Sequence, residues 1–222
     1  PRYIRDGKCY ATHASNALNK WLSWLPGGLL QANIGTSALF AATSGSSVAT
    51  AATITTVALP QGRLHNYSER LFTGSIAAGG TLGILIPPSI NLIVYGFLTN
   101  TSIPRLFLAG IVPGILLALL FMLCLAIACT IKPELGGGKL SVTWGERFET
   151  LKDLIPVLII FVVVIGSIYA GLATPTESAA LGVLASLLLA LRYKAISIEF
   201  FKQVFEGTMR TSSMIMLILI SA

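Results

Sequence analysis

Long stretches without a single charged residue are the feature that most constrains what this chain can fold into. Four segments contain no Asp, Glu, Lys or Arg: residues 21–62, 71–104, 106–131 and 154–176, which are 42, 34, 26 and 23 residues long. A helix needs only about 20 apolar residues to cross the hydrocarbon core of a bilayer, so each segment is long enough for at least one crossing. The sequence therefore predicts an all-α integral membrane protein that crosses the bilayer several times.

Composition supports this fold class and excludes several others. Only 11% of the 222 residues are charged and 54% are hydrophobic, whereas soluble domains carry about 25% charged residues. The net charge is +6, but the basic residues lie in short segments between apolar stretches, which argues against nucleic-acid binding. Three cysteines, Cys9, Cys124 and Cys129, lack the spacing of a zinc site or a disulfide framework. We expect no cofactor.

The segment 27–60 is diluted by Ala, Gly, Ser and Thr around a polar centre at 43–47. The limbs before and after this centre are 16 and 13 residues long, which is shorter than a full crossing. Non-helical backbone at membrane depth is tolerated only where protein or a water-filled cavity surrounds it. A re-entrant hairpin with a functional tip is therefore favoured, and two ordinary spans joined by a polar loop are the alternative. The small residues also suit close helix packing.

A second interrupted segment, 71–99, contains Pro87 and Pro88. Two adjacent prolines remove two amide donors and disfavour helix before each of them, so carbonyl groups around 82–86 lose their helical partners. A bound cation would satisfy these carbonyls, and so would neighbouring side chains at a simple kink. The sequence predicts a proline-broken helix and leaves both alternatives open.

The rest of the chain is expected to alternate between spans and charged segments. The expected segments are an interfacial helix over 1–26, a broken helix and the following span over 71–131, a cytoplasmic loop over 132–153, two spans over 154–191 joined by a Thr-Pro-Thr-Glu turn, and an interfacial segment with a truncated span over 192–222. This order places 14 of the 15 Lys and Arg residues on one side of the membrane and leaves only Arg105 opposite. By the positive-inside rule that side is cytoplasmic. The chain is expected to be a fragment of a longer protein.

The turn between the two later spans contains Thr174, Thr176 and Glu177. Thr176 is expected to cap the following helix, and Glu177 to favour the positive end of its dipole. This structural interpretation is favoured over a direct role in ligand binding.

The predicted membrane region offers little chemistry to an enzyme. Ser44-Gly45-Ser46 partly matches the Gly-x-Ser-Gly motif of intramembrane serine proteases, but Ala42 replaces the leading glycine and no histidine falls within a span to act as a base. A neutral hairpin tip beside a broken helix is instead typical of secondary transporters, in which hydroxyl and carbonyl oxygens bind sodium near the membrane midplane. The sequence predicts binding and movement of a solute and no catalysis.

Ordered motifs over nearly the whole chain carry a resemblance to a known family. They are Gly27-Gly28-Leu29, Ser44-Gly45-Ser46-Ser47, the run Gly83-Ile84-Leu85-Ile86-Pro87-Pro88-Ser89 with Tyr95-Gly96, the run from Phe107 to Gly114, and the run from Thr174 to Ala180. Together they resemble the large membrane subunit, DctM, of TRAP (tripartite ATP-independent periplasmic) transporters. The resemblance implies a polytopic helical transporter, of which this chain would hold one inverted repeat and part of the second.

The resemblance also implies an activity and partners. Members import organic acids, such as C4-dicarboxylates or sialic-acid-like carboxylates, with sodium as the coupling ion and an elevator-type movement. A periplasmic solute-binding protein delivers the substrate, and a small four-helix membrane subunit accompanies the large one in the cytoplasmic (inner) membrane of a bacterium or archaeon. A single-component sodium/dicarboxylate or citrate carrier without a binding protein is the alternative, and a channel or a structural scaffold is a third interpretation.

Site residues follow from the resemblance position by position. The residues that match the first sodium site of the family are Ser44, Ser46, Gly83, Ile86 and Pro88. The residues expected beside the substrate carboxylate are Gly45, Ser46 and Ser47. The family often has an acidic residue after the tip, where this chain has Thr50, and this departure puts any acid-dependent coupling there in doubt.

Overall fold

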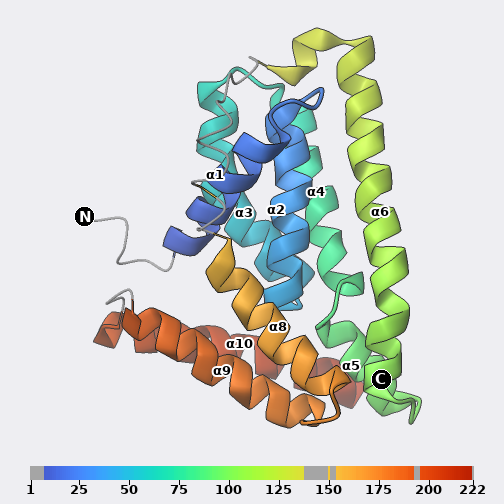
Figure 1. The fold of residues 1–222 in the computed structure, drawn as a ribbon, viewed down its shortest axis with the longest axis vertical. Coiled ribbons are helices and arrows are strands. Elements are labelled where there is room, and N and C mark those ends of the chain that lie inside the picture. Colours follow the sequence, from blue (N-terminus) through green and yellow to red (C-terminus); the bar gives the residue numbers. More distant parts are fainter. Residues whose placement is uncertain (1–7, 138–149, 151–153, 193–195, 222) are drawn as a thin grey trace.

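The computed structural model describes residues 8–137, 150, 154–192 and 196–221. Within these residues the chain forms α-helices and one short 3₁₀ helix, and no strand (Figure 1). Three segments are long and apolar enough to cross a membrane, Glu69–Leu98, Ile103–Ile131 and Pro175–Arg192, and Leu158–Tyr169 is a shorter apolar helix. The predicted all-α membrane class is confirmed.

The centre of the molecule is a helical hairpin of α2 (Gly28–Ser44) and α3 (Ser47–Leu64). At 17 and 18 residues, both helices are about 26–27 Å long, slightly less than the ~30 Å hydrocarbon core. The chain reverses at Gly45-Ser46, inside the polar centre of the segment. α3 continues one turn beyond the expected end at Pro60. A proline inside a helix removes only one amide donor, and the neighbouring hydrogen bonds keep the helix intact.

Helix α4 (Glu69–Leu85) packs against both arms of this hairpin. Glycines make the close approach possible: an added Cβ would lie 2.5 Å from Ser37 Oγ at Gly79 and 2.8 Å from Ala51 Cβ at Gly80. A buried hydrogen bond of 3.0 Å from Asn33 Nδ2 to Ser75 Oγ joins α2 to α4. Small residues and polar pairs of this kind hold helices together where lipid surrounds them. The apolar core between these helices includes Leu29, Leu30, Ile34, Ile54, Phe72, Ile76 and Leu82.

The predicted break follows α4. Helix α5 (Ile90–Leu98) begins after residues 86–89, and the Pro87–Pro88 peptide bond is cis. Helix α6 (Ile103–Ile131) then runs back along the whole length of the bundle, and the hairpin tip ends beside the α4–α5 break, short of the end where α6 begins (Figure 1). Gly110 of α6 lies against the carbonyl group of Leu85, where a Cβ would come within 2.6 Å.

Helix α1 (Lys8–Leu22) crosses α2 and α3 and packs against both (Figure 1). Its Ser15, Ala17 and Asn19 are buried. The expected interfacial helix over 1–26 is therefore part of the packed bundle over the residues described. Amphipathic spacing alone could not distinguish a helix face buried against protein from one buried against headgroups.

Helices α8 (Ile155–Tyr169) and α9 (Pro175–Arg192) form an antiparallel pair. The hydroxyl groups of Ser167 and Ser178 lie 2.7 Å apart across this pair, and Ser178 is fully buried. Helix α10 (Ile198–Ser221) is one continuous helix, where the sequence predicted an interfacial segment followed by a separate truncated span. Most of the predicted loop 132–153 lies outside the described residues, apart from a short 3₁₀ helix, η2 (Pro133–Gly136).

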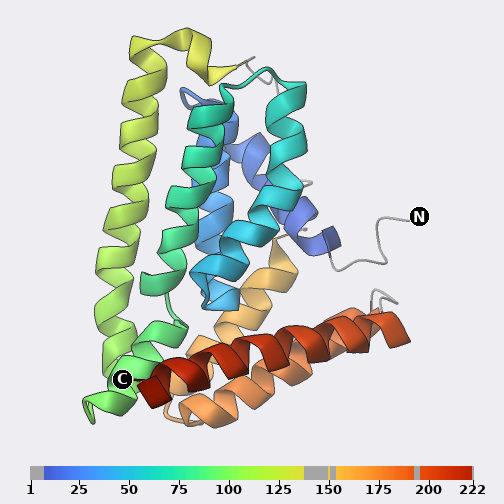
Figure 2. The ribbon, with the colours of Figure 1, turned by 180° about the vertical axis from the view of Figure 1, so that it is seen from behind.

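The basic residues agree only in part with the predicted orientation. The α3–α4 turn, η2 and the start of α2 meet at one end, where Gly137 lies near the His65 carbonyl and Gly136 near Gly27. Arg105 lies at the other end, where α6 begins. However, α9 and α10 contain further basic residues, and these two helices run crosswise to α6 at that other end, away from η2 (Figure 2). At 15 residues, α8 is about 22 Å long, which is too short to carry the chain straight across a ~30 Å core.

Candidate functional site

The hairpin tip depends on Gly45. Its φ of 61° is left-handed, and its N–H donates to the Ala41 carbonyl at 2.9 Å, which ends α2. Its own carbonyl accepts from the Ile90 N–H at 3.1 Å. A Cβ at Gly45 would lie 2.5 Å from the Pro88 carbonyl oxygen. Only glycine has both the backbone freedom and the lack of a side chain that this position requires, so the tip is fixed directly onto the broken helix.

The hydroxyl groups beside this glycine form a small cluster. Ser44 Oγ lies 2.8 Å from Thr50 Oγ1 and 3.4 Å from the Ser46 carbonyl oxygen, to which it donates. Ser46 Oγ accepts from the Ala49 N–H at 3.3 Å and thereby caps α3. Thr50 is fully buried. Thr50 therefore contributes a buried hydroxyl next to Ser44.

Gly83 of α4 lies against the same tip. A Cβ there would come within 2.9 Å of the Ser46 carbonyl carbon and of the Ser47 nitrogen. The structure thus brings together Ser44, Gly45, Ser46, Ser47, Gly83 and Pro88, which are six of the seven predicted site residues. The seventh, Ile86, is the C-cap directly after α4, and its side chain packs against Gly114 of α6.

The proline pair leaves two helical carbonyls without their usual donors, because residues 87 and 88 have no N–H to offer Gly83 and Ile84. Ser89 Oγ donates to the Ile84 carbonyl at 2.7 Å, and Ser89 is fully buried. The Ile84 carbonyl is therefore satisfied by a neighbouring side chain, which is the simple-kink alternative and not the bound cation. Sequence reasoning missed this role of Ser89, although a hydroxyl residue directly after two prolines is a visible signal.

A cavity of about 110 Å³ opens at the tip. Its walls come from the tip and the first turn of α3, from α5, and from α10: Gly45, Ser46, Ser47, Val48, Ile90, Asn91, Val94, Met214 and Ile215. The cavity thus lies at the N-termini of α3 and α5, where the helix dipole favours an anion. Asn91, Met214 and Ile215 were missed from the sequence, because only the packing of distant elements brings them to the tip.

The Thr174–Glu177 turn caps α9, but with a different residue than expected. Glu177 Oε2 accepts from both the N–H and the hydroxyl of Thr174 at 2.8 Å, and the Glu177 N–H donates back to Thr174 Oγ1 at 3.4 Å. This reciprocal pair is a capping box with proline at the first helical position. The prediction that Thr176 caps this helix is wrong; the hydroxyl of Thr176 lies 3.3 Å from that of Thr174, and the cap is made by Thr174.

Known proteins are similar to this chain over most of its length. Residues 10–222 match the family described as "Tripartite ATP-independent periplasmic transporter, DctM component". The C4-dicarboxylate TRAP transporter large permease protein DctM of Vibrio cholerae is 39% identical over 171 residues, which cover 76% of this chain and 37% of that protein.

Two relatives carry other substrate names. The ectoine TRAP transporter large permease protein TeaC of Halomonas elongata is 35% identical, over 81% of this chain and 42% of its own length. The sialic acid TRAP transporter large permease protein SiaM of Vibrio cholerae is 34% identical, over 87% and 45%. The chain thus spans about two fifths of the length of these relatives. With a family match over almost all of its residues, the chain belongs to the DctM family of TRAP transporter permeases.

Proposed function

We propose that this chain is part of the membrane permease subunit of a TRAP transporter that imports an organic acid by sodium symport, across the cytoplasmic membrane of a bacterium or archaeon. The observation that carries the proposal is the meeting of the hairpin tip with the broken helix, through the Ile90 to Gly45 hydrogen bond and the contact of Gly83 with Ser46–Ser47. Two interrupted helices that meet in an apolar bundle are typical of transporter binding sites.

Sodium suits the oxygen atoms gathered at the tip. They belong to hydroxyl groups and backbone carbonyls, among them Ser44 Oγ, Ser46 Oγ and the Gly83 carbonyl that lacks its helical donor. Hard cations prefer neutral or anionic oxygen ligands. The sodium ligands we propose are Ser44, Ser46, Gly83 and the backbone at Pro88, with Ile86 left in a supporting role beside α6.

A carboxylate suits the cavity next to these oxygens. The N-terminal turns of α3 and α5 line it, and helix N-termini stabilise negative charge. Gly45, Ser46 and Ser47 supply backbone and hydroxyl groups for one carboxylate of the substrate. Relatives are named for C4-dicarboxylate, ectoine and sialic acid, all of which carry a carboxylate, and another is named for isethionate, which carries a sulfonate. We therefore propose that the cavity recognises the anionic acid group of the substrate, a carboxylate in most of these compounds, and we leave the rest of the substrate open.

The proposal includes partners and movement. A periplasmic solute-binding protein would deliver the substrate, a small four-helix membrane subunit would flank the permease, and the hairpin with its broken helix would move as an elevator. A single-component carrier of dicarboxylate or citrate remains the competing candidate.

Uptake measured with the complete subunit tests the proposal. The subunit is reconstituted with its small subunit and binding protein, and uptake is compared under an inward sodium gradient and with potassium replacing sodium. We expect accumulation that requires both sodium and the binding protein. Accumulation without the binding protein would favour the single-component carrier, and accumulation that is indifferent to sodium would overturn the symport.

Variants at Ser46 test the site. Ser46→Ala should raise the sodium concentration for half-maximal uptake about tenfold, the ratio that a loss of ~1.4 kcal/mol in binding free energy produces. Ser46→Thr keeps the hydroxyl and the α3 cap and should restore most of the affinity. Thr73→Ala is the matched control, because that hydroxyl bonds to carbonyls of its own helix, at Glu69 and Arg70. An unchanged sodium dependence in Ser46→Ala would remove Ser46 from the site.

A further inference from the structure

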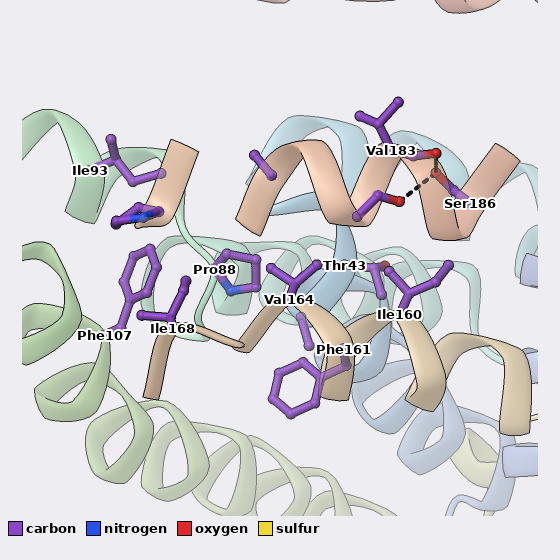
Figure 3. Close-up of a pocket in the computed structure, with 14 residues that line it drawn as sticks. Thr43, Pro88, Ile93, Phe107, Ile160, Phe161, Val164, Ile168, Val183 and Ser186 are labelled. Atoms are coloured by element: carbon purple, nitrogen blue, oxygen red, sulfur yellow. Dashed lines mark hydrogen bonds between the residues drawn. The ribbon is translucent and has the colours of Figure 1, made fainter. Parts of the chain in front are cut away.

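A second and larger cavity, of about 410 Å³, lies behind the tip. It is enclosed by the end of α2, the break, α5, α6, α8 and α9 (Figure 3). Pro88 and Val164 project into the space between the α8 and α9 ribbons, with Phe107 and Ile168 at one side. These elements are far apart in the sequence, so no sequence motif predicts this cavity.

The walls of this cavity offer a ligand no charge and no free polar group. Among the residues that the structure describes, its lining contains no charged side chain. Its hydroxyl groups are bonded to their own helices: Thr43 donates to the Phe40 carbonyl at 2.9 Å, and Ser186 bonds to the carbonyls of Gly182 and Val183 at 2.8 and 3.0 Å. A site without directional polar groups selects its ligand by apolar contact. The occupant must therefore be a hydrocarbon group.

The surroundings identify which hydrocarbon is available. α6 and α9 are both apolar enough to cross a membrane, and the part of α8 that lines the cavity belongs to a shorter apolar helix. Val183 at the rim is 66% exposed, so the cavity opens sideways to whatever surrounds these helices. An apolar cavity of about 150 Å³ already binds benzene, and the larger volume here fits a longer chain. We propose that this cavity binds an acyl chain of a membrane phospholipid.

The position of the cavity connects such a lipid to the tip. Thr43 lines the cavity and precedes Ser44, while Pro88 lines it on one side and faces Gly45 with its carbonyl oxygen on the other. An acyl chain would therefore support the back of the contact between the tip and the broken helix. This inference does not depend on sodium coupling or on the identity of the transported acid.

Photo-crosslinking tests the site directly. The complete subunit is reconstituted in phosphatidylethanolamine and phosphatidylglycerol vesicles that contain a phosphatidylethanolamine with a diazirine in its acyl chain. After irradiation, peptide mass spectrometry locates the labelled residues. We expect labelling of the α8 peptide around Val164 and Ile168 that saturates with probe, and that exceeds labelling of the lipid-facing α6 residues Leu116 and Leu119, which are more than half exposed.

Two neighbouring alanines give a matched pair of variants. Ala179 lines the cavity and Ala180 does not, although both are exposed on α9. Ala179→Phe should lower the α8 labelling about tenfold, which corresponds to ~1.4 kcal/mol of binding free energy, and Ala180→Phe should leave it unchanged. Ser186→Phe is a second cavity variant if the first one lowers the melting temperature. Equal α8 labelling in all three variants would overturn the proposal. So would a parent protein without α8 labelling, in which another segment of the full protein fills the cavity.

Discussion

Gly45 is the residue on which the tip depends most strongly. Replacing it with alanine should place a Cβ 2.5 Å from the Pro88 carbonyl oxygen and should add the ~1–2 kcal/mol cost of a left-handed conformation for a residue with a side chain. We expect Gly45→Ala to lower the melting temperature of the complete subunit and to abolish most uptake, because the tip must move away from the broken helix. Thermal unfolding in detergent and uptake in vesicles measure the two effects.

Gly74 provides the control for this substitution. It lies in α4, and an added Cβ there meets nothing within 4 Å. Alanine is favoured over glycine inside a helix by roughly 0.5–1 kcal/mol, so Gly74→Ala should leave the melting temperature unchanged or raise it slightly. The same loss of stability in both variants would show that the contact between Gly45 and Pro88 is unimportant.

At the level of residues, the sequence could indicate which groups form the tip but not what surrounds them. Ser44, Ser46 and Gly83 lie in local patterns, a polar centre inside an apolar segment and a glycine before a proline pair. Asn91 and Met214 enter the tip cavity through the packing of α5 and α10. No local pattern contains that information, since the distance between two residues of different helices depends on the whole bundle.

The capping box at the start of α9 decides how well this helix begins. Because Thr174 and Glu177 satisfy each other's backbone N–H groups, Thr174→Ala should speed amide hydrogen exchange at Glu177 and Ser178. A rise of about fivefold is the usual consequence of a lost N-cap. Exchange measured by mass spectrometry on the complete subunit would detect it.

Thr176→Ala is the matched comparison for this cap. Thr176 is exposed, and its hydroxyl contacts that of Thr174 at 3.3 Å. Exchange at Glu177 and Ser178 should therefore stay close to that of the parent protein. If Thr176→Ala accelerated exchange more than Thr174→Ala, the cap would be the one expected from the sequence and not the one in the structure.

At the level of elements, local chemistry predicted the turns better than the lengths and partners of helices. The Gly45 turn and the break at Pro87-Pro88 follow from residues that cannot continue a helix. Local residues do not predict that α3 ends at Leu64, beyond Pro60, or that α1 is buried against the hairpin. Both result from neighbouring helices, which stabilise turns that the local sequence leaves undecided.

Over the whole molecule, the end that contains the α3–α4 turn and η2 carries Arg63, Arg70 and Lys132. Tyr67 is buried at this end. Its hydroxyl oxygen accepts a hydrogen bond from the Leu29 N–H at 3.3 Å and so satisfies a donor in the first turn of α2. Burial raises the pKa of this Tyr67 phenol, against the smaller opposite effect of the Leu29 hydrogen bond, so the phenol stays neutral at neutral and mildly alkaline pH. The opposite end, around Thr101, carries Arg105 alone among the basic residues of α5 and α6.

This asymmetry predicts the orientation of the bundle. By the positive-inside rule the η2 end faces the cytoplasm and the Thr101 end faces the periplasm. Two exposed positions report on it when Cys9, Cys124 and Cys129 are replaced by alanine: Glu134→Cys in η2 and Thr101→Cys between α5 and α6. In intact cells, a membrane-impermeant maleimide should label Thr101→Cys and should reach Glu134→Cys only after permeabilisation. The two positions lie at opposite ends of α6, and α9 and α10 are left out of the test because they run crosswise to α6 (Figure 2). The reverse labelling pattern would show that the η2 end faces the periplasm.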